Sequence, residues 1–154
     1  MPIARRFNYR RDLPHLQSDG CSLFVTFRKR AHFVLPPFVR QIVIDTCLAR
    51  NGRVFELHAV VVMPEHVHML FTPLPTNDGS IYSIPEIMHG VKGESAHRIN
   101  KRLRRRGPVW QPESFDHIPR TEEQGTVEYI RQNPVRRRLV RKPGDYPWLW
   151  VASE

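Results

Sequence analysis

The sequence predicts an α+β fold of the ferredoxin-like, split βαβ type, in which helices pack on one face of an antiparallel sheet. β-rich and amphipathic helical runs follow one another in the order strand, helix, strand, strand, helix, strand. The 154 residues, 40% hydrophobic and 25% charged, have the length and composition of one folded domain. We therefore expect residues 1–154 to form a single domain, with residues 1–20 as a basic N-terminal arm.

The first strand and helix are expected between residues 22 and 50. Residues 22–28 are rich in β-branched and aromatic side chains and follow Gly20, which predicts a strand. Pro36-Pro37 then opens a helix, in which the apolar residues of the segment 38–48 fall close to helical spacing. Asn51-Gly52 ends this helix.

Two further strands and a long helix follow. Residues 53–63 and 67–72 form β-rich runs that are close enough for an antiparallel hairpin, with Pro64 at its corner. A loop over residues 73–83 leads to a helix over residues 84–103, which has an apolar stripe beneath a basic outer side.

The last predicted elements are short. Arg104 to Gly107 ends the long helix, and residues 109–110 and 115–120 suggest two short extended pieces. Thr121-Glu122-Glu123 has the pattern of an N-cap with an acidic first turn. The helix that follows carries Tyr129.

The charge balance indicates a polyanionic partner. Twenty-four Lys and Arg against fifteen Asp and Glu give a net charge of +9, which favours nucleic acid. Only Cys21 and Cys47 occur, which excludes a disulfide framework and a thiolate zinc site within one chain. The start lacks the apolar stretch of a signal peptide, and the most apolar run is far shorter than the ~20 residues of a membrane helix. We expect a cytoplasmic protein without membrane association.

His66-Val67-His68 is the first candidate for chemistry. Side chains alternate along a strand, so both imidazoles face one way and Val67 faces the other. Two nitrogen ligands on a rigid strand can hold a divalent ion. With eight histidines in the chain, such a pair also arises by chance, so the motif alone leaves a structural role open.

Tyr129 and Asn133 are the second candidate. On a helix they lie one turn apart on the same face, where a phenol and an amide oxygen can approach one ion. A structural interpretation is also open. Tyr129 could be a half-buried aromatic residue, and Asn133-Pro134 suits the N-cap and first residue of a following helix over residues 135–141.

Together these segments resemble a known family. The stretch Val60-Val61-Val62-Met63-Pro64-Glu65-His66-Val67-His68-Met69-Leu70, followed by Tyr129-Ile130-Arg131-Gln132-Asn133-Pro134-Val135-Arg136, resembles the single-tyrosine, His-hydrophobe-His transposases, specifically the REP-associated tyrosine transposases. The similarity covers most of the chain, including Lys92-Gly93 with Ser95-Ala96, Trp110-Gln111 with Phe115-Asp116, and Leu139-Val140 with Tyr146-Pro147-Trp148.

The resemblance implies a ferredoxin-like fold, a divalent ion, Mg²⁺ or Mn²⁺, and cleavage of single-stranded DNA beside a hairpin such as a REP-like palindrome. It implies that His66, His68 and Asn133 are metal ligands and that Tyr129 is the nucleophile, forming a 5′-phosphotyrosine. Relatives include single-chain forms and dimers, so a monomer or a homodimer is expected. The chain differs from the family pattern at Arg137 and Arg138, where Ala-Gly is frequent, at Glu65, where Asn is frequent, and in the N-terminal arm.

These residue types suit the reaction. A free tyrosine has a pKa of about 10, so only ~10⁻³ of it is phenolate at pH 7, and attack on a phosphodiester needs help from an ion. Exchange of one phosphoester for another is nearly energy-neutral, in agreement with the absence of a Gly-rich phosphate-binding loop. Because imidazole ligands favour transition ions, we expect Mn²⁺ to support activity at least as well as Mg²⁺.

Basic side chains are expected to contact DNA phosphates without specifying sequence. Those predicted to do so are Arg5, Arg6, Arg10 and Arg11 in the arm, Arg102, Arg104, Arg105 and Arg106 after the long helix, and Arg136, Arg137 and Arg138 near the C-terminus. Base selection is expected from the arm or from aromatic residues such as Trp110 and Trp148, although core packing is an alternative for Trp148.

Two other functions compete with a DNA-nicking and strand-joining enzyme. A non-catalytic regulator of the same fold, which binds structured DNA or RNA, fits the charge alone. A zinc hydrolase, in which water attacks and Tyr129 is structural, fits the histidine pair. The three differ in whether DNA is cut and whether a covalent adduct forms.

Overall fold

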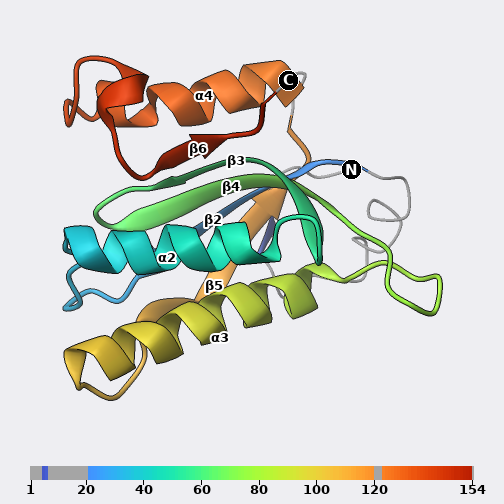
Figure 1. Ribbon diagram of the computed structural model, residues 1–154, viewed down its shortest axis with the longest axis horizontal. Helices are drawn as coiled ribbons and strands as arrows, with labels where there is room; N and C mark the ends of the chain where they lie inside the picture. The colour runs from blue at the N-terminus through green and yellow to red at the C-terminus, as the bar shows by residue number, and fades with distance from the viewer. Residues whose placement is uncertain (1–4, 7–20, 120–122, 154) are drawn as a thin grey trace.

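The computed structural model describes residues 5–6, 21–119 and 123–153 (Figure 1). One antiparallel sheet of six strands has the order β1-β5-β2-β4-β3-β6. The strands are β1 (Arg5–Arg6), β2 (Leu23–Lys29), β3 (Phe55–Val62), β4 (His66–Pro73), β5 (Trp110–His117) and β6 (Leu149–Val151). The helices are α2 (Pro37–Arg50), α3 (Ile84–Leu103), α4 (Glu123–Arg136) and the short 3₁₀ helix η1 (Pro143–Asp145).

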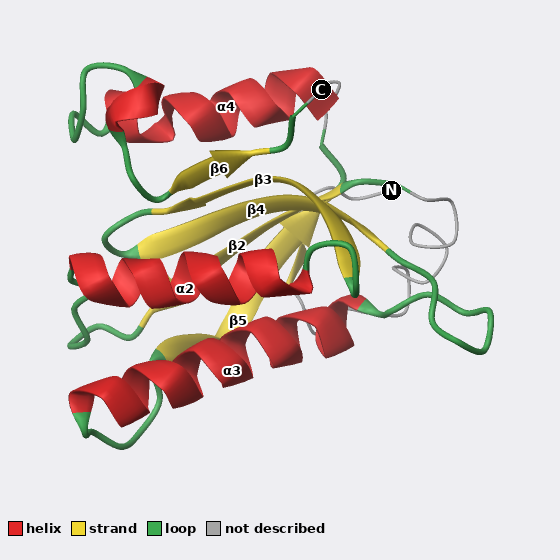
Figure 2. Cartoon of the chain, viewed as in Figure 1, coloured by secondary structure: helices red, strands yellow, loops and turns green. Residues whose placement is uncertain are grey.

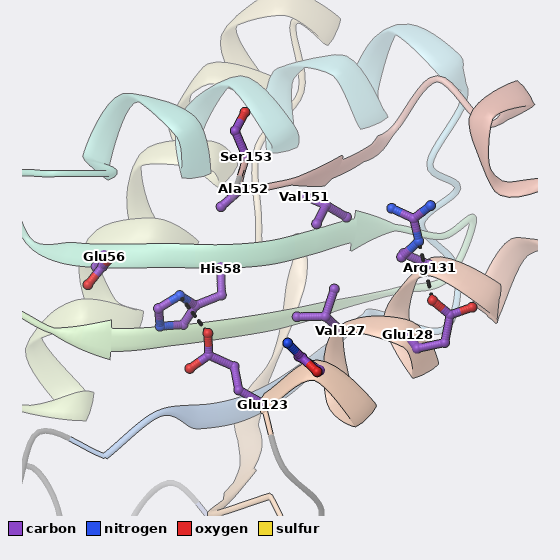
Figure 3. Close-up of a pocket in the computed structure, with 10 residues that line it drawn as sticks. Glu56, His58, Glu123, Val127, Glu128, Arg131, Val151, Ala152 and Ser153 are labelled. Carbon is purple, nitrogen blue, oxygen red and sulfur yellow. Dashed lines mark ion pairs between the residues drawn. The ribbon is translucent and has the colours of Figure 1, made fainter.

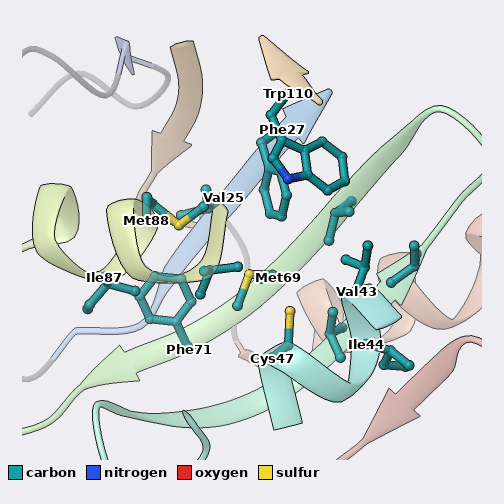
Figure 4. Close-up of a cluster of buried hydrophobic side chains, with 14 of the residues drawn as sticks. Val25, Phe27, Val43, Ile44, Cys47, Met69, Phe71, Ile87, Met88 and Trp110 are labelled. Atoms are coloured by element: carbon teal, nitrogen blue, oxygen red, sulfur yellow. The ribbon is translucent and has the colours of Figure 1, made fainter. Parts of the chain in front are cut away.

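The split βαβ prediction is confirmed. The units β2-α2-β3 and β4-α3-β5 interlock, so that β4 lies between β2 and β3. Both crossover helices pack on one face of the sheet (Figure 2). Figure 4 shows how Val43 and Cys47 of α2 and Met88 of α3 meet Val25 and Met69 of the central strands in this core.

The opposite face of the sheet carries a second, smaller core. Here Phe24, Val61 and Leu70 pack against Ile130 of α4 and against Tyr146. Alternate residues of the apolar run 59–63 therefore point into two different cores, which is why this run shows no polar alternation. Helix α4 lies on this second face, opposite α2 and α3 (Figure 1).

Three strands differ from what the sequence predicted. The two short pieces expected at residues 109–110 and 115–120 form one strand, β5, whose pairing with β2 shifts register between Phe27 and Lys29. A register shift absorbs the extra residues without ending the strand. The short strand β6, which pairs with β3, was not predicted. In the arm, β1 pairs with β5, and the rest of residues 1–20 lies outside the described residues.

The helix suggested for residues 135–141 does not form. Helix α4 instead continues through Pro134 and ends at Arg136. Arg138 then adopts a left-handed backbone with φ of 61°, and the amide of Leu139 donates to the carbonyl of Pro134 at 2.9 Å. This geometry is that of a Schellman C-cap, so the proline lies in the last turn of a helix that is already ending.

In residues 5–6, 21–119 and 123–153, no helix has both the length and the apolarity needed to cross a membrane.

Candidate active site

His66 and His68 enter β4 at one end of the sheet. They pair with Arg28 and Thr26 of β2, and both lie on the α4 face, whereas Val67 packs into the core beneath α2 and α3. The predicted orientation of the pair is thus confirmed. The two imidazole centroids are 4.5 Å apart, and the residues are 3% and 7% exposed.

The two imidazoles are bonded differently. Nδ1 of His68 and the Thr26 hydroxyl form a hydrogen bond of 2.7 Å. This bond fixes the ring, and Nε2 points away from it. Nδ1 of His66 is buried and has no hydrogen-bond partner among the described residues. The carboxylate of Glu65 is 3.9 Å from this atom.

Burial keeps both imidazoles neutral. Desolvation, reinforced by the positive charge of Arg28, lowers the pKa of His66 to about 4. Desolvation and the neighbouring His66 lower the pKa of His68 to about 3. At neutral pH both rings therefore carry the free lone pair that a metal ion requires.

Tyr129 lies on α4 beside this pair. Its ring is 6.0 Å from the ring of His68 and 6.0 Å from that of Phe24, in edge-on contacts. The residue is 47% exposed, so a phenol oxygen can meet a substrate from solvent while the ring stays in contact with the sheet. The guanidinium of Arg136 lies 4.2 Å from the centre of the Tyr129 ring.

Asn133 follows one turn later on the same helix. It is 6% exposed, and its Oδ1 has no hydrogen-bond partner among the described residues. The helix continues through this position, because the amide of Arg137 donates to the carbonyl of Asn133 at 3.0 Å. The N-cap interpretation of Asn133 is therefore wrong. An unpaired buried amide oxygen costs about 1–3 kcal/mol, which a bound cation would offset.

The predicted metal ligands are two imidazoles, those of His66 and His68, and the side-chain amide of Asn133. In the described part of the chain, no group of three His, Cys, Asp or Glu residues could hold a metal, so a site here needs the amide as its third donor. His66 Nδ1 and Asn133 Oδ1 are buried polar atoms without a hydrogen-bond partner among the described residues, which is consistent with a cation bound close by. Two neutral imidazoles and one amide oxygen fit a divalent transition ion such as Mn²⁺.

An ion pair joins the two halves of the site. Arg137, after the end of α4, binds the carboxylate of Glu65, which immediately precedes His66. The hydrogen bond from Arg137 lowers the pKa of Glu65. Both positions differ from the family pattern named above, and they are partners of each other. The neighbouring Arg138 has a left-handed backbone with φ of 61°, which glycine adopts more readily.

Two of the three predicted basic clusters, those after α3 and near the end of α4, lie at one end of the molecule. The C-terminal ends of α3 and α4 and the β3–β4 turn are all on the left in Figure 1. Arg102 lies over the Phe38 ring at 5.0 Å, and Arg105 lies over the Phe33 ring at 4.5 Å. Arg104 and Arg106 are exposed. In the arm, only the backbone of Arg5 and Arg6 is described, and Arg10 and Arg11 lie outside the described residues.

Trp110 is not available to stack on a base. It is 5% exposed, contacts Phe27 edge-on at 4.8 Å and donates its indole N–H to Ser95 at 2.9 Å. Trp148 is half-buried beside Arg40. On the histidine face, the aromatic residue with an exposed surface on β5 is Phe115, which is 42% exposed and pairs with Thr26.

A large hollow lies elsewhere, against the first half of α4 (Figure 3). Its volume is about 850 Å³, and Glu56, His58, Glu123 and Arg131 are among the residues that line it. His58 is fully engaged, with Nδ1 3.4 Å from the Glu123 carboxylate and Nε2 2.8 Å from the Thr72 hydroxyl. His66, His68, Tyr129 and Asn133 are not among the residues that line this hollow.

Comparison with known proteins places this chain in a family of transposases. The family described as "Transposase IS200 like" matches residues 25–133, so the chain belongs to that family. Within it, the chain is similar to the REP-associated tyrosine transposases, as the sequence motifs predicted.

Three relatives illustrate this similarity. The REP-associated tyrosine transposase of Escherichia coli K12 is 31% identical over 101 residues, which are 64% of this chain and 56% of that protein. The chain thus spans little more than half of that relative's length. A Haemophilus influenzae protein assigned to the same group is 27% identical across 92% of this chain and 83% of its own. A solved REP-associated tyrosine transposase bound to a REP hairpin has a TM-score of 0.61 and 27% identity, over 84% of this chain and 76% of that one.

Proposed function

We propose that this protein is a metal-dependent enzyme that cuts and rejoins single-stranded DNA beside a hairpin through a 5′-phosphotyrosine on Tyr129. The observation that carries the proposal is the contact of the half-exposed Tyr129 ring with buried, neutral His68. Family membership and the hairpin-bound relative support a REP-like hairpin as the substrate.

His66, His68 and Asn133 would hold the ion. When bound, a divalent ion polarises the scissile phosphate and neutralises charge on its non-bridging oxygens. The chain's own contribution is geometric. Thr26 fixes the His68 ring, and α4 carries Asn133 one turn from the nucleophile. The sheet and α4 together exclude water from the side of the histidines that faces the second core.

Tyr129 performs the covalent step. Its phenol oxygen forms a bond to phosphorus as the bond between phosphorus and the 3′-oxygen breaks. The phenol loses its proton to solvent, and the departing 3′-oxygen takes one up. The 5′-phosphate then remains on Tyr129, and attack by another 3′-hydroxyl reverses the step with a new DNA end. Because one phosphoester replaces another, rejoining needs no nucleoside triphosphate.

The exposed arginines would hold the DNA backbone. Arg104 and Arg106 after α3 and Arg138 after α4 are exposed at the end of the molecule where His66 lies. Arg137 and Arg105 have protein partners, Glu65 and Asn100, that DNA would have to replace or share. We expect each exposed arginine to contribute to salt-dependent affinity rather than to sequence choice.

The test is adduct formation on end-labelled hairpin oligonucleotides in Mn²⁺. Wild-type protein should give a covalent protein–DNA band on a denaturing gel, and Tyr129→Phe should give none. Tyr82→Phe, a change of the same size in the loop before α3, should behave as wild type.

The competing functions give different gels. Cleavage that persists in Tyr129→Phe without an adduct would identify the water-attack hydrolase. DNA that is retarded but uncut by both proteins, across all the hairpins supplied, would identify the binding regulator.

A further inference from the structure

The side chain of Arg136 folds back over Tyr129. Its guanidinium carbon lies 4.2 Å from the centre of the phenol ring, and Nη2 donates to the backbone carbonyl of Tyr129 at 3.0 Å. The two residues are seven positions apart, which is two helical turns and hence the same face of α4. One arginine is thus held to one tyrosine by two separate contacts.

The other contacts of the Tyr129 ring come from the sheet. Phe24 and His68 meet it in edge-on contacts with centroids 6.0 Å away. Arg136 covers the ring face, so sheet and arginine together restrict the direction of the phenol oxygen. A guanidinium over an aromatic face is an attractive arrangement, and it adds positive charge where an attacking oxygen becomes negative.

We propose that Arg136 is a positioning residue that orients Tyr129 for attack, a role that rests on the proposed function and goes beyond phosphate contact. The arginines of this segment then have different roles. Arg137 binds Glu65, and Arg138 forms the left-handed turn. Arg136 acts through the nucleophile itself.

The kinetic test separates orientation from DNA affinity. Adduct formation is measured in Mn²⁺ across a range of hairpin concentrations for wild type, Arg136→Gln and Arg136→Lys. We expect Arg136→Gln to lower the rate at saturating DNA about tenfold and to change the half-saturating concentration by less than about threefold. Arg136→Lys, which keeps the charge, should recover part of that rate.

Arg131→Gln is the matched control. It removes the same charge from α4 two residues after Tyr129, but Arg131 pairs with Glu128 at 3.4 Å rather than with the tyrosine. Both kinetic parameters should stay at the wild-type value. If Arg136→Gln raises only the half-saturating concentration, Arg136 is a phosphate contact and the positioning role is wrong.

A second measurement needs no turnover. In protein labelled with ¹³C-tyrosine, the ring signal of Tyr129, assigned by its loss in Tyr129→Phe, should move in Arg136→Gln and stay in place in Arg131→Gln. Absence of an adduct in wild type would refute the proposed function, whereas the ring signal would still decide whether Arg136 holds the ring. An unchanged signal in Arg136→Gln would overturn the inference.

Discussion

The two halves of α4 lie against histidines that are used in opposite ways. Beside the first half, both ring nitrogens of His58 have partners, the Thr72 hydroxyl and the Glu123 carboxylate, the second of which is drawn in Figure 3. Beside the second half, His66 keeps one nitrogen buried without a hydrogen-bond partner among the described residues. A histidine with both nitrogens engaged ties strands and helix together. A buried histidine with a free nitrogen has the form that a ligand requires.

The two halves of α4 also differ in open volume and in unsatisfied polar groups. The hollow of about 850 Å³ lies on the His58 side, where the polar groups satisfy one another. His66 Nδ1 and Asn133 Oδ1, which have no hydrogen-bond partner among the described residues, are buried beside the second half of α4. Buried polar atoms without partners therefore indicate the candidate site better than open volume does.

The largest contrast is expected from removal of the histidines themselves. His68→Ala should weaken Mn²⁺ binding to the free protein by about 100-fold or more, because even changes to residues behind a ligand cost roughly 10–100-fold. His58→Ala should leave the affinity within about twofold. Isothermal titration calorimetry with Mn²⁺ measures both, and an equal loss in the two variants would remove the distinction between them.

Asn133→Leu should separate binding from stability. The substitution keeps the side chain's approximate shape and removes the unpaired buried oxygen, so the free energy of unfolding should be unchanged or rise by about 1 kcal/mol. Mn²⁺ affinity should fall by about tenfold or more. Urea unfolding and metal titration on the same sample provide the two readouts. A loss of stability above about 2 kcal/mol would show that Asn133 is structural.

Two threonines provide an isosteric comparison. Thr26→Val removes the hydroxyl that fixes His68, and Thr72→Val removes the hydroxyl that pairs with His58. Each should cost about 1 kcal/mol of unfolding free energy. Only Thr26→Val should also weaken Mn²⁺ binding, by about tenfold, since it frees the orientation of a ligand. Similar metal affinities in the two variants would contradict this.

The smallest effect is expected at the ion pair between Glu65 and Arg137. Both side chains are partly exposed, so solvent screening limits their coupling in unfolding to about 0.2–1 kcal/mol. Single neutral variants should slow adduct formation a few-fold, and the exchanged pair Glu65→Arg with Arg137→Glu should recover it. The control is Glu94→Gln. It breaks the ion pair between Arg50 of α2 and Glu94 of α3, and it should leave the adduct rate unchanged.

Much of the site could be predicted because its spacing is local. Strand alternation placed His66 and His68 on one face, and helical spacing placed Tyr129 and Asn133 one turn apart. The interpretation that failed, a new helix after Pro134, relied on a local preference that the C-cap at Arg138 overrides. The burial of Trp110 depended on α3 and β2, which no local pattern around Trp110 specifies.

By itself, the sequence determined the six principal elements, their split βαβ order and the residue types of the candidate site, because backbone periodicity is set within a few residues. Only the tertiary structure decided that α4 packs on the face opposite α2 and α3. It also decided that Nδ1 of His66 is buried without a hydrogen-bond partner among the described residues, and that Glu65 meets Arg137. These outcomes depend on how segments distant in sequence bury apolar surface against each other, and that is fixed only when the whole sheet has assembled.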